Sequence, residues 1–185
     1  MINHTDEKRV GMFTESGEMR YFDELIQRYT GKVRAMIFHM VFNDADADDI
    51  TQEVFVRIVN NIHRFRNESR FSTWLYRITL NTARSYLVKR SRNPVMSTET
   101  APDQPGHSPA PDQILIGGEI LTHVTEALAA LSPSLRSAIT LTAIHGMTVQ
   151  EAAEVEGCLM ATMYWRIHRA RKILKKKLTE RSSIP

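Results

Sequence analysis

Cations and aromatic side chains alternate along one stretch near the middle of the chain, and this combination suits contact with unpaired nucleic-acid bases. Bases stack on aromatic rings while the phosphates between them meet positive charges. Glu68 is the only acid opposed to these cations. The stretch contains Arg64, Arg66, Arg70, Arg77, Arg84, Lys89, Arg90 and Arg92, interleaved with Phe65, Phe71, Trp74 and Tyr76.

Part of this stretch has a competing interpretation as ordinary core. Phe65, Phe71 and Trp74 lie at helical spacing, and for Trp74 the core interpretation is favoured. The polar loop from Asn67 to Arg70 has no place in a core. We therefore predict that this loop forms a pocket for a base that has left the stack.

A second candidate site lies near the C-terminus, where a tight turn separates two helices. Thr148 and Glu151 have the spacing of a capping box, which opens a helix, and Gly157 predicts where that helix ends. A basic helix follows the turn. This order is typical of a helix-turn-helix.

The outward face of the last helix carries side chains suited to reading duplex DNA. An inward stripe is expected at Met163, Ile167, Ala170 and Leu174. The residues opposite, near the helix start where a recognition helix meets base edges, are Ala161, Thr162, Trp165, Arg166 and Arg169. Arginine suits guanine, whereas threonine and alanine suit the thymine methyl group. The basic run that includes Lys172 suits phosphates, or is simply a solvated helix end.

An acidic cluster between these two sites has the opposite character and would repel DNA. Asp44 and Asp46 are explained by capping at the start of a helix. Asp49, Gln52 and Glu53 lie beyond the cap and face away from the apolar stripe of that helix. We therefore predict a protein contact at these three residues.

The apolar pattern places all of these residues on helices. Apolar side chains recur at intervals of three and four from Phe22 to Met40 and from Ile50 to Ile62, and nothing resembles a series of strands. We expect an all-α fold with a helical bundle and a helix-turn-helix domain, joined by a flexible, proline-rich linker. The expected ranges are a disordered tail over 1–18, the bundle over 19–93, the linker over 94–113, the second domain over 114–180 and a tail over 181–185.

Composition excludes several classes of protein. The only cysteine, Cys158, excludes an internal disulfide and a cysteine-cluster zinc site. The 7 histidines are scattered, and no glycine-rich phosphate loop is present. We expect no catalytic residue, no metal and no cofactor, and hence no enzyme. We also expect no membrane insertion and a cytoplasmic location, because the sequence has neither a long apolar segment nor a secretory signal.

Two stretches resemble the sigma-70 family of bacterial transcription initiation factors, most closely its extracytoplasmic-function (ECF) group. The family's second region is similar to DADADDITQEVFVRIV followed by FSTWLYRITLNTARSYLVKR. The fourth region, a helix-turn-helix for the −35 promoter element, is similar to GMTVQEAAEVEGCLMATMYWRIHRARKILKKKL. The resemblance implies core RNA polymerase and promoter DNA as partners, and an anti-sigma factor that keeps the protein dormant.

The resemblance assigns each candidate surface to a partner. Core polymerase would bind at Asp49, Gln52 and Glu53. The melted −10 element would be captured by Asn67, Ser69, Arg70, Phe71, Ser72, Trp74, Arg77, Asn81 and Arg84. The −35 element would be read by Ala161, Thr162, Trp165, Arg166, Arg169 and Lys172. The linker would be threaded toward the catalytic centre of the polymerase.

The chain departs from the group at the helix-turn-helix. Leu159 and Ala161 stand where proline and glycine are common, Tyr164 and Trp165 where residues are usually small or polar, and Glu156 where the residue is usually apolar. No promoter consensus is therefore carried over. The alternative function is a stand-alone helix-turn-helix regulator. It leaves the acidic surface and the polar loop unexplained and normally requires a dimer on a palindrome.

Overall fold

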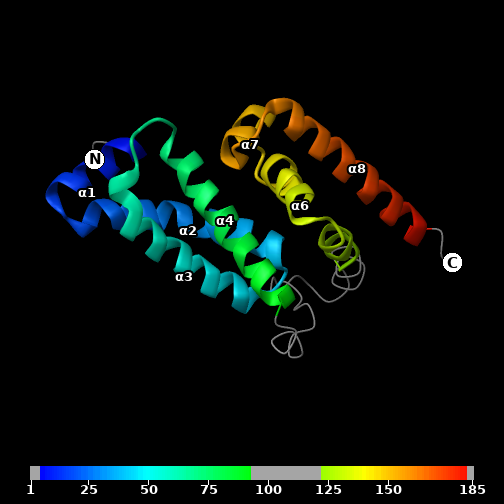
Figure 1. Cartoon of the computed structure of the whole chain (residues 1–185). Helices are drawn as coiled ribbons and strands as arrows, with labels where there is room; N and C mark the ends of the chain where they lie inside the picture. Colours follow the sequence, from blue (N-terminus) through cyan, green and yellow to red (C-terminus); the bar gives the residue numbers. More distant parts are fainter. Residues whose placement is uncertain (1–4, 93–121, 183–185) are drawn as a thin grey trace, which may run out of the picture.

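The computed structural model describes residues 5–92 and 122–182, with side chains as far as residue 179. Both ranges are helical and neither contains a strand, which confirms the predicted all-α fold (Figure 1). The predicted linker lies outside the described residues. The last helix continues to Ser182, within the stretch expected to be a tail.

The first domain is a bundle built around three long helices. Its elements are α1 (Asp6–Ser16), α2 (Met19–Val41), α3 (Asp44–Asn61), the short 3-10 turn η1 (Ile62–Arg64) and α4 (Phe71–Arg92). Helices α2, α3 and α4 pack against one another. Asn43 begins α3 by accepting a hydrogen bond from the N–H of Asp46 at 2.8 Å. Ile50, Val54 and Ile58 are buried on the inner face of α3, as their spacing predicts.

Helix α1 occupies part of the predicted disordered tail, so that prediction is wrong for residues 6–16. Polar contacts hold this helix in place. The Asp6 carboxylate accepts a hydrogen bond from the Tyr29 hydroxyl at 2.6 Å, and Arg9 pairs with Glu24 at 2.6 Å. Both partners, Tyr29 and Glu24, lie on α2. The sequence of the N-terminal stretch therefore did not indicate this helix when it was considered by itself.

The second domain contains the predicted helix-turn-helix. Its elements are helical residues 122–129, α6 (Pro133–Ile139), the π-helical turn η3 (Thr140–Ile144), α7 (Val149–Glu156) and α8 (Met160–Ser182). Thr148 and Glu151 form the predicted capping box at the start of α7. Gly157 ends α7 with a φ of 61°, a left-handed conformation in which a side chain would be strained. Met163 and Ile167 of α8 are buried, as predicted.

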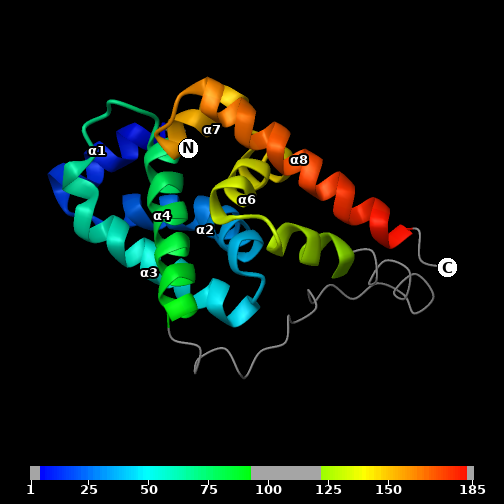
Figure 2. The ribbon, with the colours of Figure 1, turned by 45° about the vertical axis from the view of Figure 1, so that its right-hand side comes forward.

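The two domains pack directly against each other. Helix α4 contacts α7, and α2 contacts α6 and η3 (Figure 2). Arg136 of α6 donates a hydrogen bond to the carbonyl of Met40, and its guanidinium lies 5.2 Å from the centre of the Phe42 ring. The C-terminal half of α8 extends beyond the first domain (Figures 1 and 2). We call this packing the closed arrangement.

Candidate nucleic-acid and protein interfaces

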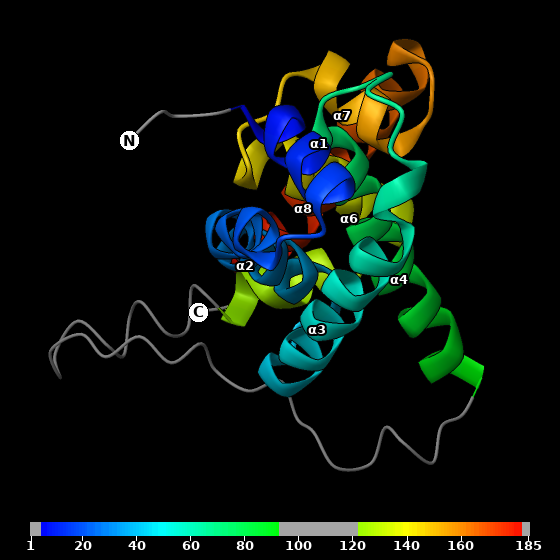
Figure 3. The same ribbon diagram turned by 90° about the vertical axis from the view of Figure 1, so that its left-hand side faces the viewer.

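The polar loop from Asn67 to Arg70 lies at the surface between η1 and α4, beside α1 (Figure 3). Asn67 has a φ of 57°, a left-handed conformation that asparagine tolerates better than most residues. Helix α4 begins directly after the loop, and the N–H of Phe71 donates to the carboxylate of Glu7 at 2.9 Å. A carboxylate here satisfies an otherwise free N–H and complements the positive end of the helix. Helix α1 therefore fixes the end of the loop.

We expect the substitution Glu7→Gln to loosen the start of α4, because the amide oxygen is uncharged and a weaker acceptor. The free energy of unfolding should fall by about 1 kcal/mol, the usual cost of losing a helix cap. Urea denaturation followed by helical circular dichroism measures this change. Glu15→Gln, at the exposed end of the same helix, is the matched control. An equal loss in both variants would contradict the capping role.

The aromatic residues beside the loop form a cluster that is largely core. Phe71 is 2% exposed and lies under Phe65 and Trp74, whose ring centres are 5.5 Å apart. The prediction that the Phe71 ring contacts −10 DNA is therefore corrected, because a buried ring offers no stacking face. Phe65 and Trp74 are half-buried, so an edge of each remains near the loop.

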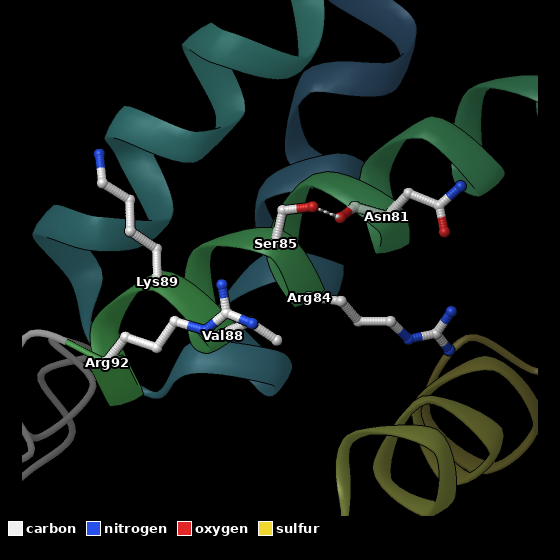
Figure 4. A pocket seen from close by; sticks show the side chains of 6 residues that line it. All are labelled: Asn81, Arg84, Ser85, Val88, Lys89 and Arg92. Carbon is white, nitrogen blue, oxygen red and sulfur yellow. Dashed lines mark hydrogen bonds between the residues drawn. The ribbon is translucent and has the colours of Figure 1, made fainter.

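An open basic groove runs along the C-terminal half of α4 (Figure 4). It is lined by Asn81, Arg84, Ser85, Val88, Lys89 and Arg92. The Ser85 hydroxyl donates to the backbone carbonyl of Asn81 at 2.9 Å, and the Asn81 side chain is exposed. Lys89 and Arg92 are also exposed. The groove combines amide and cationic groups that suit a nucleic-acid backbone.

Three of the predicted DNA-binding arginines recur at every seventh residue, and we call them the arginine row: Arg70, Arg77 and Arg84. Seven residues are close to two helical turns, so Arg77 and Arg84 lie on one side of α4, and Arg70 directly precedes this helix. In the closed arrangement all three contact the second domain. Arg70 lies 3.6 Å from the Glu151 carboxylate, and Arg77 donates to the backbone carbonyl of Glu154 at 2.6 Å.

The last member of the row meets a buried carboxylate. Arg84 donates to the Ser137 hydroxyl at 2.7 Å and also pairs with Glu156. The Glu156 side chain is only 2% exposed, and its other oxygen accepts from Arg166 of α8 at 2.9 Å. Glu156 therefore joins an arginine predicted to contact −10 DNA to an arginine predicted to contact the −35 element. Sequence reasoning noted Glu156 as a departure from the group but did not predict these partners.

The predicted recognition face of α8 is open except at Arg166 and at the half-buried Thr162. Ala161, Arg169 and Lys172 are exposed, and Trp165 is 63% exposed. The guanidinium of Arg166 is turned toward Glu156, so it does not share the open surface in this structure. Leu159, Met160 and Tyr164 are also exposed and add an apolar border that the DNA-reading prediction did not include.

A cleft separates the recognition helix from the polar loop. Ser69 and Arg77 line it from the first domain, and Gln150 and Thr162 line it from the second. The closed arrangement thus brings together residues predicted to contact the −10 and −35 elements. These elements are distinct segments of DNA, so the cleft does not correspond to one continuous DNA site.

The predicted protein-binding surface lies on α3, on the side facing away from its buried stripe. Asp49, Gln52 and Glu53 are all exposed, and Glu53 pairs with Arg57 at 2.6 Å. Val56 is 59% exposed, one turn after Gln52. A large apolar side chain outside the inner stripe was the signal that sequence reasoning overlooked here. The surface therefore combines acidic, amide and apolar groups, as a protein contact requires.

Two histidines face each other across the domain interface. The rings of His39 on α2 and His145 after η3 are 6.4 Å apart and nearly perpendicular. Burial lowers the pKa of both histidines, and the nearby His39 and Lys32 lower the pKa of His145 further. A hydrogen bond between His39 Nδ1 and the carbonyl of Ala35 opposes the effect of burial on the pKa of His39. Protonation therefore adds positive charge to an interface that already contains Lys32.

We expect acid to separate the domains. Histidines exposed by separation regain a pKa near 6.5, so the separated form binds protons more readily than the closed form. The closed arrangement keeps its stability above about pH 6.5 and loses it as the pH falls below that value. Small-angle scattering should show a larger radius of gyration at about pH 5.5 than at about pH 7.5.

The combined substitutions His39→Phe and His145→Phe should remove this pH dependence, whereas exposed His63→Phe should keep it. A radius of gyration that does not change with pH in the original chain would contradict the expectation. So would a pH response that persists in the double variant.

Metal-binding clusters and membrane-spanning helices are both absent from the part of the chain that the structure describes. Within residues 5–92 and 122–182, no group of three or more histidine, cysteine, aspartate or glutamate side chains is arranged to hold a metal ion. In the same ranges, no helix is both long and apolar enough to cross a membrane.

Comparison with known proteins identifies relatives over almost the whole chain. Residues 25–93 match the family model for sigma-70 region 2, and residues 122–174 match that for sigma-70 region 4. The chain is 32% identical to the RNA polymerase sigma-H factor of Pseudomonas aeruginosa, with 96% of each chain covered. It is 31% identical to the ECF RNA polymerase sigma-E factor of Escherichia coli K12, with 89% of this chain and 90% of the relative covered.

Solved structures share the fold. CnrH, determined in complex with the cytosolic domain of CnrY, matches with a TM-score of 0.71 and 27% identity, covering 95% of this chain and 97% of that one. The sigma factor RpoE of Bartonella quintana, in complex with the anti-sigma factor NepR, matches with a TM-score of 0.67 and 26% identity, covering 85% and 96%. The chain therefore belongs to the sigma-70 family and, within it, to the ECF group of RNA polymerase sigma factors.

Proposed function

We propose that this chain directs core RNA polymerase to promoters and assists opening of the −10 element. The observation that carries this proposal is the presence of three separate surfaces on one member of the sigma-70 family. Two are basic and suited to DNA, on α4 and on α8, and one is acidic and suited to protein, on α3. A stand-alone regulator needs only α8 and leaves the other two surfaces without a role.

The first DNA surface captures the melted −10 element. An unpaired base enters the loop formed by Asn67 and Ser69, beside the half-buried Trp74. The arginine row, with Asn81 and the nearby Ser72, binds the backbone of the same strand. These residues act by trapping single-stranded DNA, which favours the open form of the promoter.

The second DNA surface docks on the −35 duplex. Trp165 and Arg169 are exposed at the start of α8, with Ala161 and Thr162 beside them, and they read base edges in the major groove. Lys172 binds phosphate one turn later. Arg166 is paired with Glu156, so it is not a main base contact of this face.

Polymerase binds the acidic surface of α3. Asp49, Gln52 and Glu53 are exposed on this helix, and they precede the residues of both DNA surfaces in the sequence. Bond formation is performed by the polymerase, and this chain contributes no catalytic group. The factor acts in the cytoplasm, where its polymerase and promoters are, and an anti-sigma factor controls it. The structural resemblance to RpoE, which was determined bound to an anti-sigma factor, supports that control.

The test is size-exclusion chromatography with purified core RNA polymerase. The original chain should co-elute with the polymerase, whereas the double variant Asp49→Arg and Gln52→Arg should not. The variant Asp23→Arg with Gln27→Arg makes the same change in charge at exposed positions of α2, and it should still co-elute. Failure of the original chain to bind, in a folded sample, would contradict the proposed function. Binding by all three chains would agree with the proposed function but would show that the polymerase contact lies elsewhere on the chain.

A further inference from the structure

Helix α7 lies against the arginine row, with its first turn beside Arg70 and its C-terminal end beside Arg77 and Arg84. Arg70, Arg77 and Arg84 are each bound by oxygen atoms of this one short helix. The same arginines are the ones that the proposed function assigns to the backbone of −10 DNA. One set of cations therefore has two prospective partners, the oxygen atoms of α7 within the chain and the phosphates of the promoter.

The oxygens of α7 suit guanidinium groups for two reasons. The backbone carbonyls of the last helical turn lack partners within the helix, and they form the negative end of its dipole. Arg77 donates to two of these carbonyls, that of Glu154 at 2.6 Å and that of Val155 at 3.4 Å. Phosphate oxygens offer arginine the same combination of negative charge and free lone pairs.

Glu156 adds a full negative charge to this helix end. A carboxylate that is 2% exposed is costly to bury unless cations and hydrogen bonds compensate it. Arg84 and Arg166 provide that compensation from opposite sides of the domain interface. Separating the domains removes one of these two partners, so the pair with Arg84 specifically favours the closed arrangement.

We propose that the C-terminal end of α7 is an internal competitor of −10 DNA, which occupies Arg77 and Arg84 of the arginine row in the free chain and uses Glu156 as its main contact. The proposal rests on the proposed role of the arginine row at the −10 element. Binding of DNA to α4 and packing of α7 on α4 exclude each other. The free chain therefore binds single-stranded DNA weakly, and separating the domains exposes the row.

The experiment compares Glu156→Gln with Glu154→Gln in the full chain. Both variants remove one negative charge from the same helix turn, but the Glu154 side chain is exposed, and among the described residues its hydrogen-bond partner is Gln150. Fluorescence anisotropy with a labelled single-stranded DNA of mixed sequence measures binding, and small-angle scattering measures domain separation. Circular dichroism verifies that each variant is folded.

We expect Glu156→Gln to increase the radius of gyration and to raise DNA affinity about tenfold, the equivalent of about 1.4 kcal/mol. Glu154→Gln should change both quantities much less. Arg84→Gln breaks the same ion pair from α4, so it should also separate the domains, but without the gain in DNA affinity. These three results together would support both competition by α7 and DNA binding by Arg84.

Two other outcomes overturn the proposal in distinguishable ways. If folded Glu156→Gln and Arg84→Gln both remain compact, Glu156 is not the contact that holds the domains together, whatever the arginine row binds. If Glu156→Gln separates the domains without any gain in DNA affinity, the arginine row does not bind DNA. That second outcome also removes the proposed −10 role, whereas co-elution with polymerase tests the sigma-factor function independently.

Discussion

Replacing Arg136 with methionine should lower the free energy of unfolding by about 3–5 kcal/mol, because several buried carbonyls lose a charged donor together. Arg136 is 8% exposed, and its guanidinium donates to the carbonyls of Leu128 at 3.1 Å and Ala129 at 2.6 Å. It also reaches the carbonyl of Met40 in the first domain. Methionine fills a similar volume but donates nothing, so these acceptors remain buried without their donor.

Urea denaturation monitored by circular dichroism measures the effect. Arg136→Lys should recover only part of the loss, because an ammonium group cannot reproduce the planar fork of guanidinium donors. Arg171→Met, at an exposed position of α8, is the control and should be nearly neutral. A loss at Arg136 no larger than at Arg171 would show that the carbonyl contacts contribute little.

Replacing Arg169 with alanine should weaken binding of the −35 duplex about tenfold or more. A bidentate arginine contact to guanine discriminates by about 1–3 kcal/mol, and Arg169 is the exposed arginine on the outer face of α8 that no partner occupies in the described structure. Arg166→Glu is a poor test of the same face. It would place a carboxylate beside buried Glu156 and disturb the fold.

The measurement is competition binding of the polymerase complex to a promoter that depends on this chain, together with footprinting of its upstream element. Arg171→Ala is the matched control, because this exposed arginine lies two residues further along α8 and so points to another side of the helix. Arg169→Ala should lose upstream protection, whereas Arg171→Ala should keep it. Equal protection by both variants would remove Arg169 from the recognition face.

The predictable parts of the fold are those that depend on local sequence patterns. The inner stripe of α3, the capping box of Thr148 and the glycine that ends α7 depend on residues a few positions apart, and the structure has each of them. Helix α1 was missed because it is held by contacts with α2, namely polar contacts and a ring contact between Phe13 and Phe22, whose centres are 5.3 Å apart. Asp6 and Tyr29 are 23 residues apart, and no periodicity relates them.

The residues of the candidate surfaces were predictable from the sequence, but the contacts that these residues make within the folded chain were not. Sequence placed Arg84 and Arg166 among the DNA-binding residues, and the structure shows both held by Glu156 from the end of α7. Arg84 and Glu156 are separated by 72 residues, so their pairing follows from how the domains pack and not from either local pattern. The burial of Phe71 is similar, because its ring spacing alone fits both a core and a stacking surface.

The most direct test of the central claim is transcription of genomic DNA by purified core polymerase, with and without this chain, followed by sequencing of the RNA 5′ ends. We predict new start sites that require the chain and share two sequence blocks upstream. The variant Asp49→Arg with Gln52→Arg should lose these starts, whereas Asp23→Arg with Gln27→Arg should keep them. An identical set of 5′ ends with and without the folded chain would contradict its function as a sigma factor.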